Sequence, residues 1–240
     1  MAGTATPVVS ESFNVNNPRT GTVLYQVTEP TGADMDQAYV TAREASAALR
    51  SLSVEDRLRE LAKLKVYIQQ NKEDIIQRIV DETGKPRIEA LMTEIFPTLD
   101  LIAYYEKNAA KFLRVQKPST PLVMMGKKSR IYYEPLGPVL IISPWNYPFN
   151  LSMTPIITAL VAGNPVIFKP SEHTPLRGVI EDILDGAGFP ADFVQVIYGG
   201  KEIGKQLIDR QPAKIFFTGS EAAGKAIMAH AAQYLIPVEL

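Results

Sequence analysis

The chain has 240 residues, of which 46% are hydrophobic and 21% charged, and its formal net charge is −1. This composition is typical of a globular protein, and the near-neutral charge without clustered basic residues argues against a nucleic-acid partner. The sequence has no cysteine and only two histidines, His173 and His230, which excludes disulfides, thiolate metal sites and a cysteine nucleophile in these 240 residues and disfavours a multi-histidine metal site.

The N-terminal half is expected to form a hairpin followed by a layer of helices. Alternating apolar positions on both sides of N-P-R-T-G (17–21) predict a hairpin within residues 1–30. Helical spacing of apolar residues then predicts helices over 34–50, from Ser53 to about 70, over 71–83 and over 87–113. After them, proline-punctuated residues 117–135 predict a β excursion.

From Pro138 the pattern changes to short apolar runs that alternate with helices. Strands are predicted at 139–143, 165–169, 193–197 and 213–218, and helices at 151–162, 175–187, 201–209 and 221–234. Strands that are apolar throughout and separated by helices predict a Rossmann-like α/β fold, with a parallel sheet covered by helices on both faces. The last apolar residues, after Pro237, predict the first half of another buried strand.

Polar or glycine-rich segments follow all four strands, at the sheet edge where such folds bind ligands. They are S-P-W-N-Y-P-F-N (143–150), K-P-S-E (169–172), Y-G-G (198–200) and T-G-S-E-A-A-G-K (218–225). In the last segment Gly219 permits close approach of a ligand, and Ser220 with the first helical N–H groups suits an anion, although a plain serine cap is the simpler interpretation.

The first two segments each allow two interpretations. Lys169 and Glu172 have the chemistry to bind ribose hydroxyls, or they form a surface ion pair. Asn146, held between prolines, presents an amide suited to an oxyanion, or it only bonds backbone within a rigid aromatic loop. The sequence has no G-x-G-x-x-G, Y-x-x-x-K or G-x-x-x-x-G-K-[ST] motif, which excludes a P-loop nucleotide site.

Taken together, three stretches resemble the aldehyde dehydrogenase superfamily in order and spacing. They are E-P-L-G-P-V-L-I-I-S-P-W-N-Y-P-F, A-G-N-P-V-I-F-K-P-S-E and F-F-T-G-S-E-A-A-G-K. E-T-G-K-P-R-I-E-A and F-N-V-N-N-P-R-T-G are similar to that family as well, so the resemblance covers essentially the whole chain. W-N-Y-P-F-N, Pro155 and H-A-A-Q-Y-L-I-P-V are most similar to the branch that oxidises medium- and long-chain or aromatic aldehydes.

The resemblance implies that residues 1–240 form an NAD- or NADP-binding domain, with Asn146 as the side-chain half of an oxyanion hole. The cofactor-binding residues it implies are Ile142, Ser143, Pro144 and Trp145 along the cleft, Lys169 and Glu172 at the adenosine ribose, Gly200 and Gly204 near the adenine, and Gly219, Ser220, Glu221, Ala222, Ala223 and Gly224 at the pyrophosphate. Pro155 replaces a lysine that contacts ribose and phosphate in many members, so this contact is expected to be absent. No metal is implied.

The family reaction needs a cysteine thiolate and a glutamate base, and the resemblance implies that both are absent from this chain. The chain is therefore expected to stop before the catalytic domain and to be inactive alone. In the full-length enzyme we expect an aldehyde substrate, a homo-oligomer to which residues 117–135 contribute, no membrane span and a cytoplasmic location. Glu172 favours NAD, because a carboxylate repels the 2′-phosphate of NADP, but both cofactors remain open.

Two other functions remain possible from the sequence. The chain is a non-catalytic dinucleotide-binding or interaction module, or it is an unrelated dehydrogenase with its own acid–base pair. The missing G-x-G-x-x-G, Y-x-x-x-K and cysteine speak against the unrelated dehydrogenase.

Overall fold

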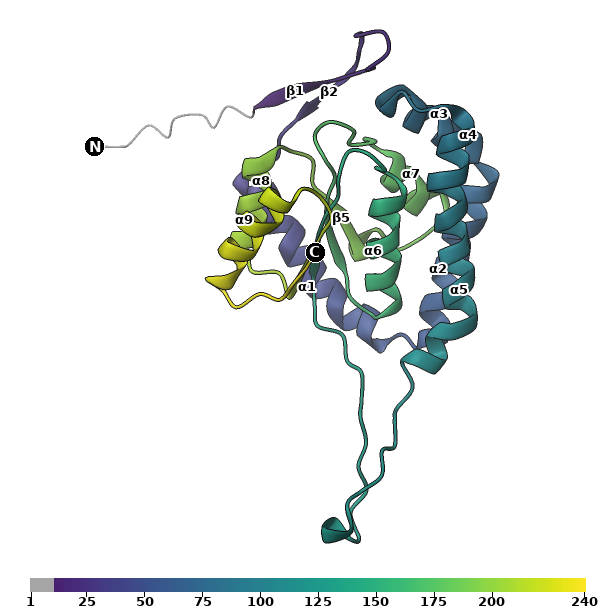
Figure 1. The fold of residues 1–240 in the computed structure, drawn as a ribbon, viewed down its shortest axis with the longest axis vertical. Helices are drawn as coiled ribbons and strands as arrows, with labels where there is room; N and C mark the ends of the chain where they lie inside the picture. The colour runs from purple at the N-terminus through teal and green to yellow at the C-terminus, as the bar shows by residue number, and fades with distance from the viewer. Residues whose placement is uncertain (1–10) are drawn as a thin grey trace, which may run out of the picture.

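A computed structural model describes residues 11–240, and it begins with the predicted hairpin. Strands β1 (Ser12–Asn16) and β2 (Val23–Thr28) pair antiparallel, and Figure 1 shows them apart from the main sheet. In the turn between them, the Asn17 side-chain oxygen accepts the N–H groups of Arg19 and Thr20. The part of the predicted hairpin region before residue 11 lies outside the described residues.

The predicted helices follow the hairpin, and they are α1 (Gly32–Ser51), α2 (Val54–Gln70), α3 (Lys72–Thr83), α4 (Arg87–Ala90) and α5 (Phe96–Phe112). They do not form the single layer expected from the sequence: Met35, Tyr39 and Ala42 of α1 pack on one face of the main sheet, whereas α2, α3 and α5 cover the other face (Figure 1). Capping boxes begin α1 and α2, and the expected start at Ser53 is confirmed, because its hydroxyl accepts the Asp56 N–H while the Asp56 carboxylate accepts the Ser53 N–H. Gly84, at φ 73°, ends α3 in the left-handed conformation that glycine tolerates.

The helix predicted over 87–113 is not uniform. A π turn at Leu91–Ile95 separates α4 from α5. Pro97 explains it, because proline has no N–H and its ring clashes with the carbonyl four residues earlier in a regular helix. The sequence pattern predicted the helical segment but not this widening.

The predicted parallel sheet is confirmed. It contains β3 (Val139–Ile142), β4 (Val166–Lys169), β5 (Val194–Val196), β6 (Lys214–Phe217) and β7 (Val238–Glu239), all parallel, in the order β5-β4-β3-β6-β7. The intervening helices are α6 (Asn150–Val161), α7 (Val179–Gly186), α8 (Lys201–Asp209) and α9 (Glu221–Ala232). The strand order reverses at β3, so a crevice forms beside the carboxyl ends of β3 and β6.

The strand register separates two layers of core side chains. Leu140 lies beside Ile167 and Ile215, and this face packs against α1, α8 and α9. Ile141 lies beside Phe168, and that face packs against α2, α6 and α7. Because successive strand residues point to opposite faces, the fully apolar runs supply both layers at once.

The expectation of a buried strand after Pro237 is correct for the strand but not for its burial. β7 pairs with β6 through Val238 and Glu239. Val238 is only partly buried, and Glu239 and Leu240 are exposed. The reason is that β7 is an outer strand of the sheet in the described part of the chain, with β6 on one side only.

Residues 113–138 form a long arm that leaves the body and returns to it (Figure 1). The predicted β excursion is extended, but among the described residues its two limbs pair as a β-bridge only at Gln116 and Ile131. Pro118 and Pro121 contribute to this, because proline cannot donate to a strand ladder. The tip is a short turn, Leu122–Met124, whose apolar side chains are exposed.

A buried carboxylate joins the hairpin, the helical layer and the segment after β4. Glu82 accepts the Tyr25 hydroxyl at 2.5 Å and the Leu176 N–H at 2.8 Å. The Arg177 N–H donates to the Tyr25 hydroxyl oxygen at 3.2 Å. Leu176 has a φ of 47°, which is unusual for a leucine, so Glu82 holds a loop that local preference alone does not favour.

Candidate cofactor site

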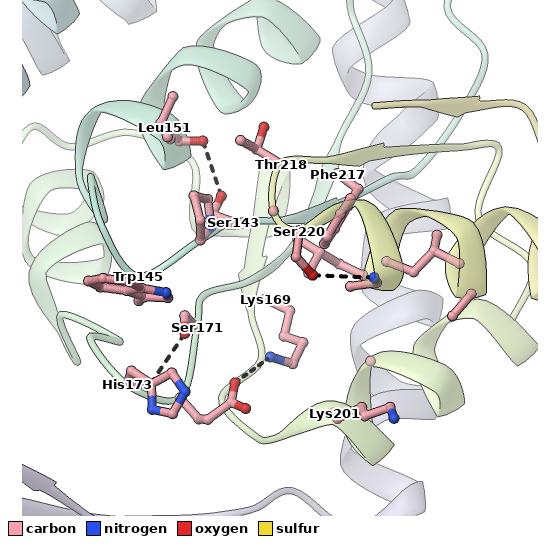
Figure 2. A pocket seen from close by; sticks show the side chains of 18 of the residues that line it. Ser143, Trp145, Leu151, Lys169, Ser171, His173, Lys201, Phe217, Thr218 and Ser220 are labelled. Atoms are coloured by element: carbon pink, nitrogen blue, oxygen red, sulfur yellow. Dashed lines mark hydrogen bonds and ion pairs between the residues drawn. The ribbon is translucent and has the colours of Figure 1, made fainter.

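A cleft of about 520 Å³ opens at the carboxyl ends of β3, β4 and β6 (Figure 2). It lies where the strand order reverses, which is the place where open α/β sheets bind ligands. Its volume is within the range of small-molecule and cofactor sites. The floor is formed by strand ends, and the walls by the loops that follow β3 and β4 and by one face each of α8 and α9.

The structure brings most of the sequence-predicted site residues together in this cleft. Those that line it are Ile142, Ser143, Pro144, Trp145, Asn146, Lys169, Glu172, Gly204, Gly219, Ser220 and Ala223. They come from four segments that are separated by up to about 80 residues, and parallel strand ends are what gathers them.

Four predicted residues do not line the cleft. The Gly200 N–H donates to the Glu29 carboxylate at 2.6 Å. Glu221 and Ala222 are exposed at the start of α9, and Glu221 pairs with Lys225. Gly224 is buried, with Leu240 beside it. Pro155 is buried within α6 and does not line the cleft, so this chain offers no side chain there for the ribose and phosphate contact.

Lys169 is the buried cation of the cleft, since only 3% of its surface is exposed. Its ammonium donates to the Pro170 carbonyl at 3.0 Å and lies 3.6 Å from the Glu172 carboxylate (Figure 2). Burial lowers the pKa of Lys169, and the nearby Glu172 and Glu29 carboxylates partly oppose this. The ion pair considered from the sequence does form, but it is not a surface pair, because Lys169 lies inside the protein and only Glu172 reaches the surface.

The N-terminus of α9 forms the opposite wall. The Ser220 hydroxyl accepts the Ala223 N–H at 3.3 Å, so the plain serine cap is real and also faces the cleft. Gly219 is required beside it, because a Cβ there would lie 2.3 Å from the Phe217 ring. The first N–H groups of a helix lack partners within the helix and carry partial positive charge, which suits a phosphate.

Asn146 lies in an exposed loop at the mouth of the cleft. Its side-chain oxygen accepts the Tyr147 N–H at 3.1 Å, which is the local backbone bond considered from the sequence. That bond uses the oxygen and leaves the amide N–H₂ as the donor, so local bonding and oxyanion binding are compatible. Ser143 and Thr174 brace the loop, through the Leu151 carbonyl at 3.1 Å and the Trp145 carbonyl at 2.8 Å.

Many residues that line the cleft were not among the site residues predicted from the sequence. The additional lining residues are Leu151, Ser171, His173, Lys201, Lys205, Ile208, Phe217, Thr218, Ala226, Ile227 and His230. Several follow helical spacing from predicted positions: Lys201, Lys205 and Ile208 share a face of α8, and Ala226, Ile227 and His230 share a face with Ala223 on α9. Helical periodicity was therefore the signal that could have identified them.

Within residues 11–240, no group of three or more histidine, aspartate or glutamate side chains is placed to hold a metal ion. No helix in the same range is long and apolar enough to cross a membrane.

Comparison with known proteins matches the model of the aldehyde dehydrogenase family to residues 6–240. The 4,4'-diapolycopene aldehyde oxidase of Methylomonas sp is 41% identical over 93% of this chain and 43% of its own length. The 4,4'-diaponeurosporen-aldehyde dehydrogenase of Staphylococcus aureus is 40% identical over 77% of this chain and 40% of its own length.

Solved structures give the same result. The NAD+ complex of an aldehyde dehydrogenase from Bacillus cereus superposes with a TM-score of 0.87 at 28% identity, covering 95% of this chain and 47% of that one. The chain spans less than half the length of these three relatives. With a family match over almost all of its residues, the chain belongs to the aldehyde dehydrogenase family.

Proposed function

We propose that the chain provides the dinucleotide-binding site of an enzyme that oxidises an aldehyde to a carboxylic acid with NAD or NADP. The observation that supports this most is the cleft at the strand-order reversal, with buried Lys169 on one side and the N-terminus of α9 on the other. A cation and a helix N-terminus together complement a ligand that carries both ribose hydroxyls and phosphates.

The residues present fit such a cofactor. Lys169 and Glu172 supply a donor and an acceptor for ribose hydroxyls, and Ser220 with the first turn of α9 supplies N–H groups for the pyrophosphate. Gly204 packs beside the Lys169 side chain, and a Cβ there would make only an ordinary contact with it, at 3.6 Å. When bound, the nicotinamide would accept hydride from the substrate.

In the reaction, Asn146 would donate its amide N–H₂ to the oxygen that gains charge when the aldehyde carbon is attacked. A thiolate nucleophile is not available within these 240 residues, because the sequence has no cysteine. We therefore propose that this chain alone binds the cofactor and does not oxidise aldehydes.

For the substrate, we propose an apolar aldehyde. The names of the two curated relatives, which refer to diapolycopene and diaponeurosporen aldehydes, support that class.

For the cofactor, Glu172 supports NAD, since a carboxylate 3.6 Å from the ribose-binding ammonium would repel a 2′-phosphate. For assembly, the exposed apolar arm tip, with Leu122, Val123 and Met125, supports self-association in a homo-oligomer.

The second candidate function is a dinucleotide-binding module without catalysis. One observation favours it: the cleft is formed in a chain that has no cysteine. The two candidates differ in whether a nucleophile-bearing segment joins this cleft, and they share the prediction that the cleft binds cofactor.

Titration of the 240-residue chain with NAD+ is expected to raise its melting temperature saturably. A ligand at about 100 times its Kd stabilises the folded state by about 2.7 kcal/mol, which corresponds to roughly 5–10 °C for a chain of this size. Differential scanning fluorimetry measures the shift, and NADH absorbance after addition of an aldehyde tests for turnover. No shift at millimolar NAD+ and NADP+ would contradict the proposed site, and aldehyde-dependent NADH formation would contradict inactivity of the chain alone.

A further inference from the structure

Glu94 occupies an unusual position, a fully buried carboxylate in a π turn. Its exposed fraction is 0%, although it lies in a helical segment that faces solvent on its other side. The π turn arises beside Pro97, and the Phe96 N–H donates to the Leu91 carbonyl five residues earlier. Such turns are rare and frequently occur at functional positions.

The Glu94 carboxylate contacts the start of α6, more than 50 residues away in the chain. One oxygen accepts the Phe149 N–H at 2.8 Å and the Asn150 N–H at 3.2 Å. α6 has no side-chain cap of its own from the residue that precedes it. Glu94 therefore does for α6 what a capping side chain does for other helices, and its charge is favoured by the helix dipole.

Lys85 completes this arrangement. Its ammonium donates to the other Glu94 oxygen at 2.5 Å, and only 10% of the lysine side chain is exposed. The same ammonium lies 3.8 Å from the centroid of the Tyr147 ring. Tyr147 in turn donates its N–H to the Asn146 side chain. Lys85 and Glu94 thus contact the residues on the C-terminal side of Asn146 through both a ring and the backbone.

We propose that Glu94 and Lys85 are positioning residues that fix the loop carrying Asn146, and so set the direction in which its amide points. This inference deepens the proposed function, on which the oxyanion role of Asn146 rests. A buried ion pair is on average no more stabilising than apolar residues of the same volume. Stability alone therefore does not account for the Lys85–Glu94 pair. What distinguishes the pair is that its contacts reach one loop, the loop at the mouth of the cleft.

The fluorescence of Trp145 reports the mobility of the loop, and its measurement needs neither cofactor nor aldehyde. It is the only tryptophan of the chain and is the neighbour of Asn146. Its fluorescence anisotropy and its quenching by acrylamide therefore report the loop alone. Failure of the proposed function, such as absence of NAD+ binding, would leave this measurement unaffected.

The test uses Glu94→Gln, which keeps a similar shape without charge, and Lys85→Met, which keeps length without charge. We expect each to raise the quenching constant of Trp145 about twofold and to lower its anisotropy, because a loop released from its anchor opens locally. The matched controls are Glu106→Gln and Lys65→Met, which break another Glu–Lys pair of the helical layer, 2.6 Å apart.

Circular dichroism separates local release from unfolding. The proposal predicts native far-ultraviolet spectra for both loop variants, with a change at Trp145 that the controls do not show. The proposal would be overturned if the quenching constant and anisotropy of Trp145 equalled those of the wild type in both folded variants. It would also be overturned if the control variants changed these values by the same amount. If Glu94→Gln does not fold, Lys85→Met decides by the same criterion, and if neither folds the pair is structural and the proposal is wrong.

Discussion

Replacing Lys169 by methionine is expected to weaken NAD+ binding by about 10- to 100-fold, because hydrogen bonds that involve a charged group contribute about 1.5–3 kcal/mol. The melting temperature without ligand is expected to stay the same or rise. Lys169 is 3% exposed, so its ammonium loses hydration that one carboxylate at 3.6 Å only partly replaces, whereas methionine fills the same space without that cost.

Isothermal titration calorimetry of the wild type and the variant measures this effect, with Lys65→Met as a control for loss of a lysine outside the cleft. Equal dissociation constants for wild type and Lys169→Met would contradict the assignment of Lys169 to the ribose. Burial also lowers the pKa of Lys169. The wild type should therefore lose affinity as the solution becomes alkaline, below the pH at which an exposed lysine loses its proton.

Replacing Glu82 by leucine is expected to lower the free energy of unfolding by about 3 kcal/mol, which corresponds to a melting temperature about 6–12 °C lower. The substitution leaves the Leu176 N–H and the Tyr25 hydroxyl without their acceptor in a region where water does not replace it. Thermal unfolding followed by circular dichroism measures the change. A loss below about 1 kcal/mol, within the range of ordinary surface substitutions, would show that Glu82 does not hold the loop.

The sign of the pH dependence gives a second test of the same residue. Burial raises the pKa of Glu82, partly opposed by hydrogen bonds from Tyr25 and Leu176. Because the folded state binds this proton more tightly, the contribution of the group to stability is present below its usual pKa of 4.5 and is lost as the pH rises through the folded value. Glu82→Gln should remove this part of the pH dependence of stability. Equal slopes of the free energy of unfolding against pH in the wild type and the variant would contradict this expectation.

The sheet could be predicted from sequence because its strands are apolar on both faces. Runs such as residues 139–142 supply two core layers, and this pattern fits a parallel sheet covered by helices. The π turn was not predictable from periodicity, because one proline changes the helical repeat without changing which residues are apolar. The arm was only partly predictable, because its sequence resembles strands while its limbs meet at one bridge.

The residues that line the cleft could be predicted where a polar or glycine-rich segment follows a strand directly. Lys169, Ser143 and Gly219 lie at or just beyond strand ends, and the parallel sheet aligns those ends. Gly200 does not line the cleft, and its N–H donates to Glu29, a contact that no local pattern could indicate because Glu29 lies far away in the sequence. Glu94 was missed for the same physical reason: it contacts Phe149 from 55 residues away, and no local pattern carries that contact.

The proposed cofactor site is tested most directly by a crystal structure of this chain grown with millimolar NAD+. We expect the dinucleotide in the cleft between β3, β4 and β6, with its pyrophosphate at the N-terminus of α9 beside Ser220 and a ribose hydrogen-bonded to Lys169 and Glu172. A dinucleotide bound elsewhere, or an empty cleft in crystals whose packing leaves it open, would show that these strand ends do not form a cofactor site.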